Sequence, residues 1–430
     1  MKILKKDELF ELRDFLVLWS TQSISQLGSS ITSFALTLWL YEKTGSSLST
    51  AALTICSYAP YVLMSIFAGA LTDRFDKRRT MLSCDLFAAI CTVIVFVLFR
   101  TDHLMVWHLY VLNGISGLMN TVQQPASEVA MTLIVPEKYY QKTSGLRSLS
   151  GSLISILNPL IATAFYAFAG LNIVIAVDLG SFAIAFMVLL FFIRIPGKRY
   201  EKRESVFKLV KEGLGFLKET PLILTLILFM AGVNLVASAF DATLPGFVIP
   251  SPRGGSYVLG IVTSCAGIAM VIGSLIVSVL PKPKDRVKVI YLTMLFSLGS
   301  ENFLLAFSRE PVLWCIGQFI GWILVPIMNA NMDVILRTAI PVELQGRVYA
   351  CRNTLQFFTI PIGLFLGGLM VDHVCEPFME AYGHLSILKT AFGTGKGSGA
   401  ALMMFILGVC GILICILTGR KLKKYRYDER

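Results

Sequence analysis

The chain has 430 residues, of which 55% are hydrophobic and 15% charged, and its mean hydropathy is +0.71. A soluble globular chain carries about 25% charged residues, and a soluble protein this apolar could not cover its own surface. The net charge of +11 sits in short segments between apolar runs. This pattern argues against a secreted domain or a nucleic-acid-binding protein and predicts an all-α, polytopic membrane protein.

Twelve apolar runs predict twelve membrane-spanning helices, because a helix needs about 20 apolar residues to cross about 30 Å of hydrocarbon. The first run is too long for the apolar part of a secretion signal. The segment 375–397 is expected to be a glycine-containing loop. The expected spans are residues 15–41, 48–72, 80–100, 104–135, 142–169, 171–194, 222–249, 256–280, 287–308, 311–340, 347–374 and 398–420.

Positive charge fixes the expected orientation, since Lys and Arg gather in cytoplasmic loops. An even number of spans places both termini on one side. If that side is the cytoplasm, it holds 32 of the 38 Lys and Arg residues. We therefore expect a multi-pass plasma-membrane protein with both termini cytoplasmic. The six basic residues left outside are Lys43, Arg100, Arg253, Arg309, Lys389 and Lys396.

The longest basic stretch divides the spans into two groups of six. We expect a six-helix bundle over residues 1–194, a cytoplasmic linker over 195–221, and a second six-helix bundle with a cytoplasmic tail over 222–430. Apolar residues of the linker recur at helical spacing, which predicts an amphipathic helix on the membrane surface; a solvated linker is the alternative. The residues concerned are Phe207, Val210, Leu214 and Leu217, with Lys208, Lys211 and Lys218 as anchors.

A repeat with an offset of 205 residues relates the two groups. The fourth span carries polar residues on one helix face, followed by a proline and an arginine, and the tenth span repeats the pattern. Two parallel six-span repeats are typical of secondary transporters. The matched positions are Asn113 and Gln318, Gln124 and Asn329, Glu128 and Asp333, Pro136 and Pro341, and Arg147 and Arg352.

Spans one, four, seven and ten carry polar faces, which are costly in a membrane unless they meet water or protein. We expect these four helices to line a central pathway for an amphipathic substrate that is neutral or cationic. The candidate cavity residues are Gln22, Gln26, Asn113, Asn120, Gln124, Asn234, Ser238, Gln318 and Asn329.

The acids within the spans suggest two roles. Near the cytoplasmic face, ion pairs that form and break would make an inner gate; Glu128 or Asp333 could alternatively carry a proton. Burial favours the protonated form of an acid, so a membrane acid can exchange protons near neutral pH. Asp241 is the best single candidate for proton coupling, and Asp178 is a further one. The expected gate residues here are Glu128, Arg147, Asp333, Arg337 and Arg352.

The loop after the second span, Gly-Ala-Leu-Thr-Asp-Arg-Phe-Asp-Lys-Arg-Arg over residues 69–79, resembles the Gly-x-x-x-Asp-Arg-x-Gly-Arg-Arg loop motif of the major facilitator superfamily. Asp76 stands where that family commonly has Gly. The segments 13–16, 124–126 and 345–348 are similar to the drug:proton antiporter branch that includes macrolide efflux permeases. The resemblance adds Gly69, Asp73, Arg74 and Arg78 to the expected inner gate.

The resemblance implies a transporter that exports amphipathic compounds, such as macrolide-like drugs, in exchange for protons. Export of a natural metabolite such as a siderophore, or lysophospholipid transport, is the alternative. A membrane enzyme or receptor is a third class, but the sequence has no G-x-S-x-G, H-E-x-x-H or P-loop motif. We expect no cofactor, metal or nucleic acid. The expected partners are a small molecule, protons and membrane lipid, and the protein is expected to be monomeric.

Overall fold

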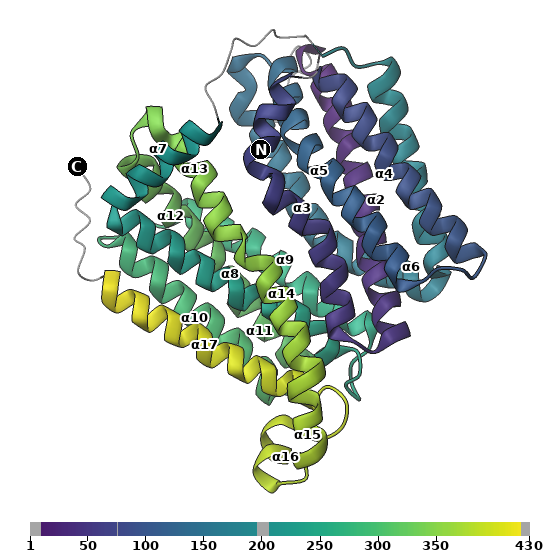
Figure 1. The fold of residues 1–430 in the computed structure, drawn as a ribbon, viewed down its shortest axis with the longest axis vertical. Coiled ribbons are helices and arrows are strands. Elements are labelled where there is room, and N and C mark those ends of the chain that lie inside the picture. Colours follow the sequence, from purple (N-terminus) through teal and green to yellow (C-terminus); the bar gives the residue numbers. More distant parts are fainter. Residues whose placement is uncertain (1–9, 75, 196–205, 423–430) are drawn as a thin grey trace. The chain divides into compact units, whose positions relative to one another are not determined.

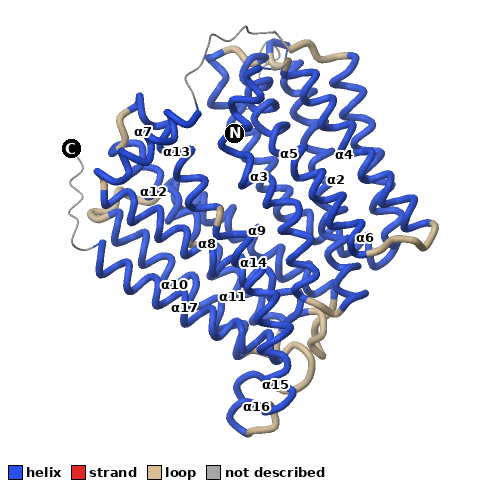
Figure 2. Tube along the Cα trace, viewed as in Figure 1, coloured by secondary structure: helices blue, strands red, loops and turns tan. Residues whose placement is uncertain are grey.

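The structure is a computed structural model that describes residues 10–74, 76–195 and 206–422. Within these ranges the chain folds into helices joined by short turns, without a strand (Figure 2). The predicted all-α class is confirmed.

Contacts divide the chain into two compact units. Unit 1 comprises residues 1–36 and 56–203, and unit 2 comprises residues 37–55 and 204–430. The helices α2 (Arg13–Thr44) and α3 (Ser47–Arg74) therefore each begin or end in unit 2 and continue into unit 1. The segment that joins them is the Thr37–Ile55 hairpin, which packs with unit 2.

Unit 1 is built from α2 and α3 together with α4 (Lys77–Arg100), α5 (Val106–Ile134), the short η1 (Glu137–Tyr139) and α6 (Tyr140–Phe191). Gly170, with φ of +71°, interrupts the helical backbone of α6, as glycine can at little cost. The break falls between the expected fifth and sixth spans. A cluster of buried side chains, including Phe15, Met81, Met131 and Leu189, joins α2, α4, α5 and α6.

Unit 2 contains the remaining helices, and α10 lies beside α17 along its length (Figure 1). Its core helix α8 is buried over most of its residues. The elements are α7 (Val206–Glu219), α8 (Pro221–Val248), α9 (Ser256–Val279), α10 (Arg286–Phe307), α11 (Pro311–Ile323), α12 (Val325–Ala339), α13 (Val342–Phe357), α14 (Thr359–Met370), η2 (Val371–Cys375), α15 (Glu376–Tyr382), α16 (Ser386–Phe392) and α17 (Ser398–Leu422).

Nine stretches of the described chain are long and apolar enough to span a membrane, so the expected count of twelve is not confirmed in full. The stretch Leu146–Phe191 holds two expected spans that meet at Gly170. Helices α2 and α5 are not among the nine. Both carry lines of Gln, Asn, Ser and Thr residues, which lower their hydropathy.

The expectation of a loop over 375–397 is wrong, because α15 and α16 form there and project beyond the ends of α14 and α17 (Figure 1). Glu376 fixes this segment to the start of α17. Its Oε1 accepts hydrogen bonds from the backbone N–H groups of Gly397 at 2.9 Å and Ala400 at 3.3 Å. Phe392 of α16 stacks on Phe307 of α10, with ring centroids 5.8 Å apart.

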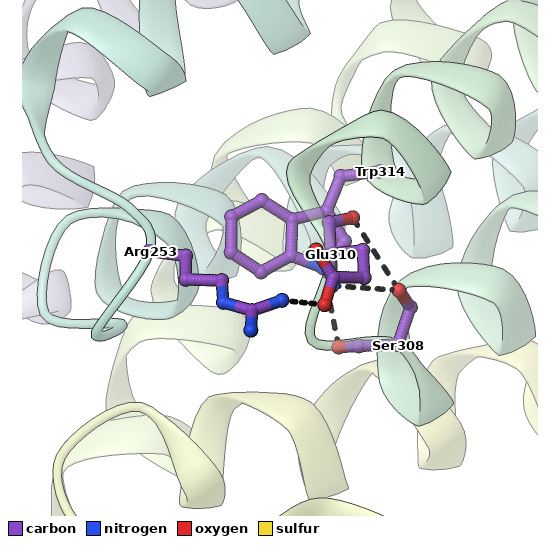
Figure 3. Close-up of polar contacts among 4 residues, drawn as sticks. All are labelled: Arg253, Ser308, Glu310 and Trp314. Carbon is purple, nitrogen blue, oxygen red and sulfur yellow. Dashed lines mark hydrogen bonds and ion pairs between the residues drawn. The ribbon is translucent and has the colours of Figure 1, made fainter.

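The start of α11 is tied to the loop after α8 (Figure 3). Arg253 of that loop forms an ion pair with Glu310, which precedes α11. Trp314 donates from Nε1 to the carbonyl oxygen of Ser308 at 3.2 Å and meets Phe247 edge-on at 5.1 Å. These contacts hold the ends of α8, α10 and α11 together within unit 2.

The linker forms α7, which packs against α13. Glu212 forms an ion pair with Arg347, and a β-carbon on Gly213 would lie 2.7 Å from the Arg347 carbonyl oxygen. Lys211 and Lys218 are exposed. Residues 196–205 and the Lys208 side chain lie outside the described part of the chain.

Candidate substrate and coupling site

Asp241 occupies an unusual position on α8. Asp241 is the one exposed residue between positions 238 and 248 of this helix, and all the others there are buried. The helix is long and apolar enough to span a membrane. An acid at such a position requires water, a ligand or another polar group beside it.

Glu301 of α10 provides a second acid in unit 2, on a helix that contacts α8. Glu301 is 6% exposed, and its Oε1 accepts a hydrogen bond from Trp322 Nε1 at 3.1 Å. A β-carbon on Gly321 would lie 2.6 Å from Glu301 Oε2, so the glycine leaves room for the carboxyl group. Within the described chain, neither acid forms an ion pair with Lys, Arg or His.

The absence of a cationic partner has a chemical consequence. An uncompensated carboxylate is costly inside a protein or a membrane. Two neighbouring carboxyl groups lower that cost when one of them holds a proton, or when a cation binds between them. The pair can therefore exchange a proton for a positively charged ligand.

The other polar residues of α8 have structural contacts. Asn234 is half-buried and donates from Nδ2 to the Gln356 carbonyl oxygen at 3.1 Å. Ser238 is buried and packs against Gly363 of α14. Gln318 of α11 is also buried, at 2% exposure. These three expected cavity residues lie between helices of unit 2.

In α5 the expected polar face is exposed at three successive turns, at Asn120, Gln124 and Glu128. Asn113 lies two turns before Asn120 on the same face. It is half-buried and donates to the carbonyl oxygen of Leu109 in its own helix at 2.9 Å. On α2, Gln26 is exposed and Gln22 is half-buried. In unit 2, Asn329 and Asp333 are exposed on α12, at the repeat positions of Gln124 and Glu128.

Each unit contains one of the two ion pairs that the repeat relates. Arg147 lies 3.6 Å from Glu128 in unit 1, and Arg352 lies 3.9 Å from Asp333 in unit 2. Both acids are exposed. Arg352 also donates from Nε to Gln356 Oε1 at 3.1 Å. Arg337 is exposed on α12.

The loop motif caps two helices of unit 1. Asp76 is the N-cap of α4 and accepts from the backbone N–H of Arg79 at 2.8 Å, which explains why Asp serves at this position. Arg78 donates to the carbonyl oxygens of Leu189 and Leu190 at the end of α6. A cation is favoured at a helix C-terminus. The other motif residues expected at the inner gate are Gly69, Asp73 and Arg74, and their surroundings lie outside the described part of the chain.

Asp178 joins two helices of unit 1. It is buried in α6 and accepts a hydrogen bond from Ser29 of α2 at 3.0 Å. A β-carbon on Gly28 would lie 3.2 Å from Asp178 Oδ1. These contacts give the acid a packing role between α2 and α6.

Asp85 of α4 is an acid that the sequence analysis missed. It accepts a hydrogen bond from Gln123 of α5. The available signal was a lone acid inside the apolar run 80–100. Its amide partner comes from another helix, so the sequence alone could not pair them. Among the described residues, no group of three or more His, Cys, Asp and Glu is arranged to hold a metal.

Comparison with known proteins identifies relatives over most of the chain. The family profile described as Major Facilitator Superfamily matches residues 18–296. Macrolide efflux protein A of Streptococcus pyogenes is 25% identical over 366 residues, covering 84% of this chain and 90% of that protein. Multidrug efflux pump Tap of Mycolicibacterium fortuitum is 26% identical over 365 residues, covering 80% and 86%.

Solved structures with a similar fold are membrane transporters. A bacterial homolog of the human lysosomal transporter Spinster, in an inward-facing and occupied conformation, matches with a TM-score of 0.72 at 13% identity, covering 96% of this chain and 98% of that one. The nucleoside transporter NupG matches with a TM-score of 0.69 at 11% identity, covering 94% and 99%. These likenesses concern the fold.

Proposed function

We propose that this chain, which belongs to the major facilitator superfamily, exports amphipathic small molecules in exchange for protons. Membership of the family makes it a multi-pass membrane transporter rather than an enzyme. The substrate class is supported by relatives whose names describe macrolide and multidrug efflux. Macrolide-like drugs, many of which carry an amine, are the first substrates to test.

The acid pair of unit 2 is the observation that carries the coupling proposal. Asp241 is exposed on a membrane-spanning helix, and Glu301 is buried on α10, which contacts that helix; among the described residues neither acid forms an ion pair with a cation. We assign Asp241 the exchange of a proton for substrate, because it is the accessible member. Glu301, held by Trp322, keeps a second carboxyl group near it and disfavours two simultaneous negative charges.

The energy available from one proton is sufficient for drug export. A charge that moves through about 150 mV releases about 3.4 kcal/mol. With about 1.4 kcal/mol per tenfold ratio, one proton per molecule sustains a gradient of roughly 300-fold for a neutral substrate. The exporter therefore needs no nucleotide.

The two repeat-related ion pairs are proposed to form the inner gate. Glu128 and Asp333 are exposed, so each pair contributes only about 0–1 kcal/mol. Contacts of this strength can break and re-form in each transport cycle. On this proposal both termini are cytoplasmic and the protein works as a monomer in the plasma membrane.

Expression in a drug-sensitive bacterial host tests the proposed function. Cells that carry the chain should tolerate more macrolide than cells with the empty vector and should extrude a cationic dye, and a protonophore should abolish dye extrusion. Resistance that survives the protonophore would contradict proton coupling. Unchanged sensitivity to every amphipathic compound tested, with the protein present in the membrane, would contradict the substrate class.

The role of Asp241 is tested in the same cells. Asp241→Asn should abolish resistance without lowering the amount of protein in the membrane, whereas Asp241→Glu, which keeps the carboxyl group, should restore part of it. Glu380→Gln is the matched control, because Glu380 is an exposed acid on α15 away from the pair. Full resistance in Asp241→Asn cells would show that another group carries the proton.

A further inference from the structure

The Thr37–Ile55 hairpin belongs to unit 2 but is continuous with helices of unit 1. It packs with unit 2, yet the helices on both sides of it, α2 and α3, continue into unit 1. Any movement of unit 1 relative to unit 2 must therefore bend α2 and α3 near residues 36 and 55 or pull the hairpin away from unit 2. The contacts of the hairpin decide between these outcomes.

One carboxyl group holds the tip of the hairpin. Asp372, in η2, accepts hydrogen bonds from Ser46 Oγ at 2.6 Å and from the backbone N–H groups of Ser47 at 3.1 Å and Leu48 at 2.9 Å. The first N–H groups of a helix have no partner within the helix, and a negative charge is favoured beside them. An acid of η2 thus acts as the cap of α3.

The hairpin also fits closely on unit 2. A β-carbon on Gly368 of α14 would lie 2.6 Å from the Leu48 Cα atom. Ser256, the first residue of α9, donates to Glu42 Oε1 at 2.7 Å. Ser47 and Thr50 are 1% and 3% exposed. The side chains of Ser47 and Thr50 are therefore shielded from water at the start of α3.

The contact also has an apolar part. One buried cluster consists of Ala51, Ala242 and Leu364, with Ile55 and Ile360 packed at its edge. Separation would expose this apolar surface at a cost that scales with its area. Water can replace the three hydrogen bonds to Asp372 once the hairpin moves away. The polar part of the contact can therefore open and re-form.

We propose that Asp372 is a clasp that holds the Thr37–Ile55 hairpin shut on unit 2 and releases it during each transport cycle. The hairpin is then the moving part of a gate at the end of unit 2 where α14 ends and α17 begins, the outer end in the proposed orientation. This proposal rests on the proposed transport function, because only alternating access requires the hairpin to move.

Cysteine labelling tests the clasp without a transported substrate. Thr50→Cys places a thiol one turn into α3, where the closed hairpin shields it. In the full-length protein in liposomes, Asp372→Ala should speed labelling of that thiol by a membrane-impermeant maleimide about tenfold or more, since hydrogen bonds to a charged group are lost. Asp372→Asn, which keeps one acceptor oxygen, should give an intermediate rate.

The labelling experiment has a control and a reserve variant. Glu380→Ala removes an acid from the neighbouring α15 and should leave the rate unchanged. The nine native cysteines set the background, which is measured in the protein without Thr50→Cys. If Asp372→Ala does not fold, Ser46→Ala removes one of the three donors and should still accelerate labelling. Equal rates with and without the intact clasp, in a folded variant, overturn the proposal.

A crosslink tests whether release accompanies transport. Glu42→Cys and Ser256→Cys, joined by a short bifunctional thiol reagent, should tie the hairpin shut and stop drug export until the link is reduced. Each single-cysteine variant, treated alike, is the control. Export that continues at the uncrosslinked rate in fully crosslinked protein overturns the release step. If the untreated protein exports nothing, the proposed function fails, and the labelling result still decides whether the clasp exists.

Discussion

At the scale of single residues, two neighbours on α11 define the environment of Glu301. Trp322 donates a hydrogen bond to its carboxyl group, and Gly321 leaves room for that group. Both lie about 20 residues further along the chain, and the packing of α10 on α11 brings them to Glu301.

Gly321→Ala tests the fit around Glu301. The added β-carbon would lie 2.6 Å from Glu301 Oε2, so the carboxyl group must move away from Trp322. We expect a loss of about 1–3 kcal/mol in the free energy of unfolding, as for overpacked cores, together with slower proton-driven transport. Thermal unfolding in detergent and dye efflux measure the two effects.

Gly299→Ala is the matched control on α10. Its β-carbon would lie 3.4 Å from Ile412 Cδ1, an ordinary contact, so no destabilisation is expected, and the higher helix propensity of Ala should stabilise the protein by up to about 1 kcal/mol. If Gly321→Ala behaves like Gly299→Ala in both measurements, the fit of Glu301 against α11 has no role in stability or coupling.

At the scale of elements, long periodic segments were predictable and short ones were not. The linker helix was expected from its apolar spacing, and α7 forms there. Helices α15 and α16 have seven residues each, and helices shorter than about 12 residues are marginal without tertiary contacts. Two contacts support them: Glu376 of α15 accepts hydrogen bonds from the start of α17, and Phe392 of α16 stacks on Phe307 of α10. The local sequence does not reveal these contacts.

The docking of α7 on α13 predicts opposite results for two glycines of one helix. A β-carbon on Gly213 would meet the Arg347 carbonyl oxygen at 2.7 Å and Cys351 Sγ at 2.8 Å, whereas nothing lies within 4 Å of one on Gly215. Gly213→Ala should weaken the docking of α7 and speed proteolysis of the linker. Gly215→Ala should leave docking intact and stabilise the helix by about 1 kcal/mol.

Limited proteolysis and thermal unfolding of the two variants measure this difference. Equal protease resistance and equal unfolding temperatures for Gly213→Ala and Gly215→Ala would mean that α7 does not rest on α13 in the membrane-embedded protein.

At the scale of the whole molecule, the 205-residue repeat was the most informative feature of the sequence. It placed Glu128 with Arg147, and Asp333 with Arg352, at matched positions, and each unit contains the corresponding ion pair. The family and the all-α fold were also predictable, because the apolar composition extends along the chain and the loop motif is one contiguous segment over residues 69–79. The count of spans was harder, since the polar faces of α2 and α5 lower the hydropathy on which such a count depends.

The distribution of Lys and Arg predicts the orientation of the molecule. Lys389 on α16 and Lys284 between α9 and α10 are both exposed. On the proposed orientation, Lys389→Cys reacts with an impermeant maleimide in intact cells, whereas Lys284→Cys reacts only after the membrane is permeabilised. The reverse pattern would invert the topology and, with it, the assignment of the inner gate and the clasp.

The most direct test of proton-coupled export uses purified protein in liposomes with an imposed pH gradient. The native protein should accumulate a labelled macrolide against its concentration gradient, and a protonophore should dissipate the accumulation. Asp241→Asn should fail to accumulate the drug while still exchanging labelled for unlabelled drug across the membrane, because binding and movement remain without proton coupling. Accumulation of the drug by Asp241→Asn at the native rate would contradict the proposed role of Asp241. Accumulation by the native protein that does not depend on the pH gradient would contradict proton-coupled export.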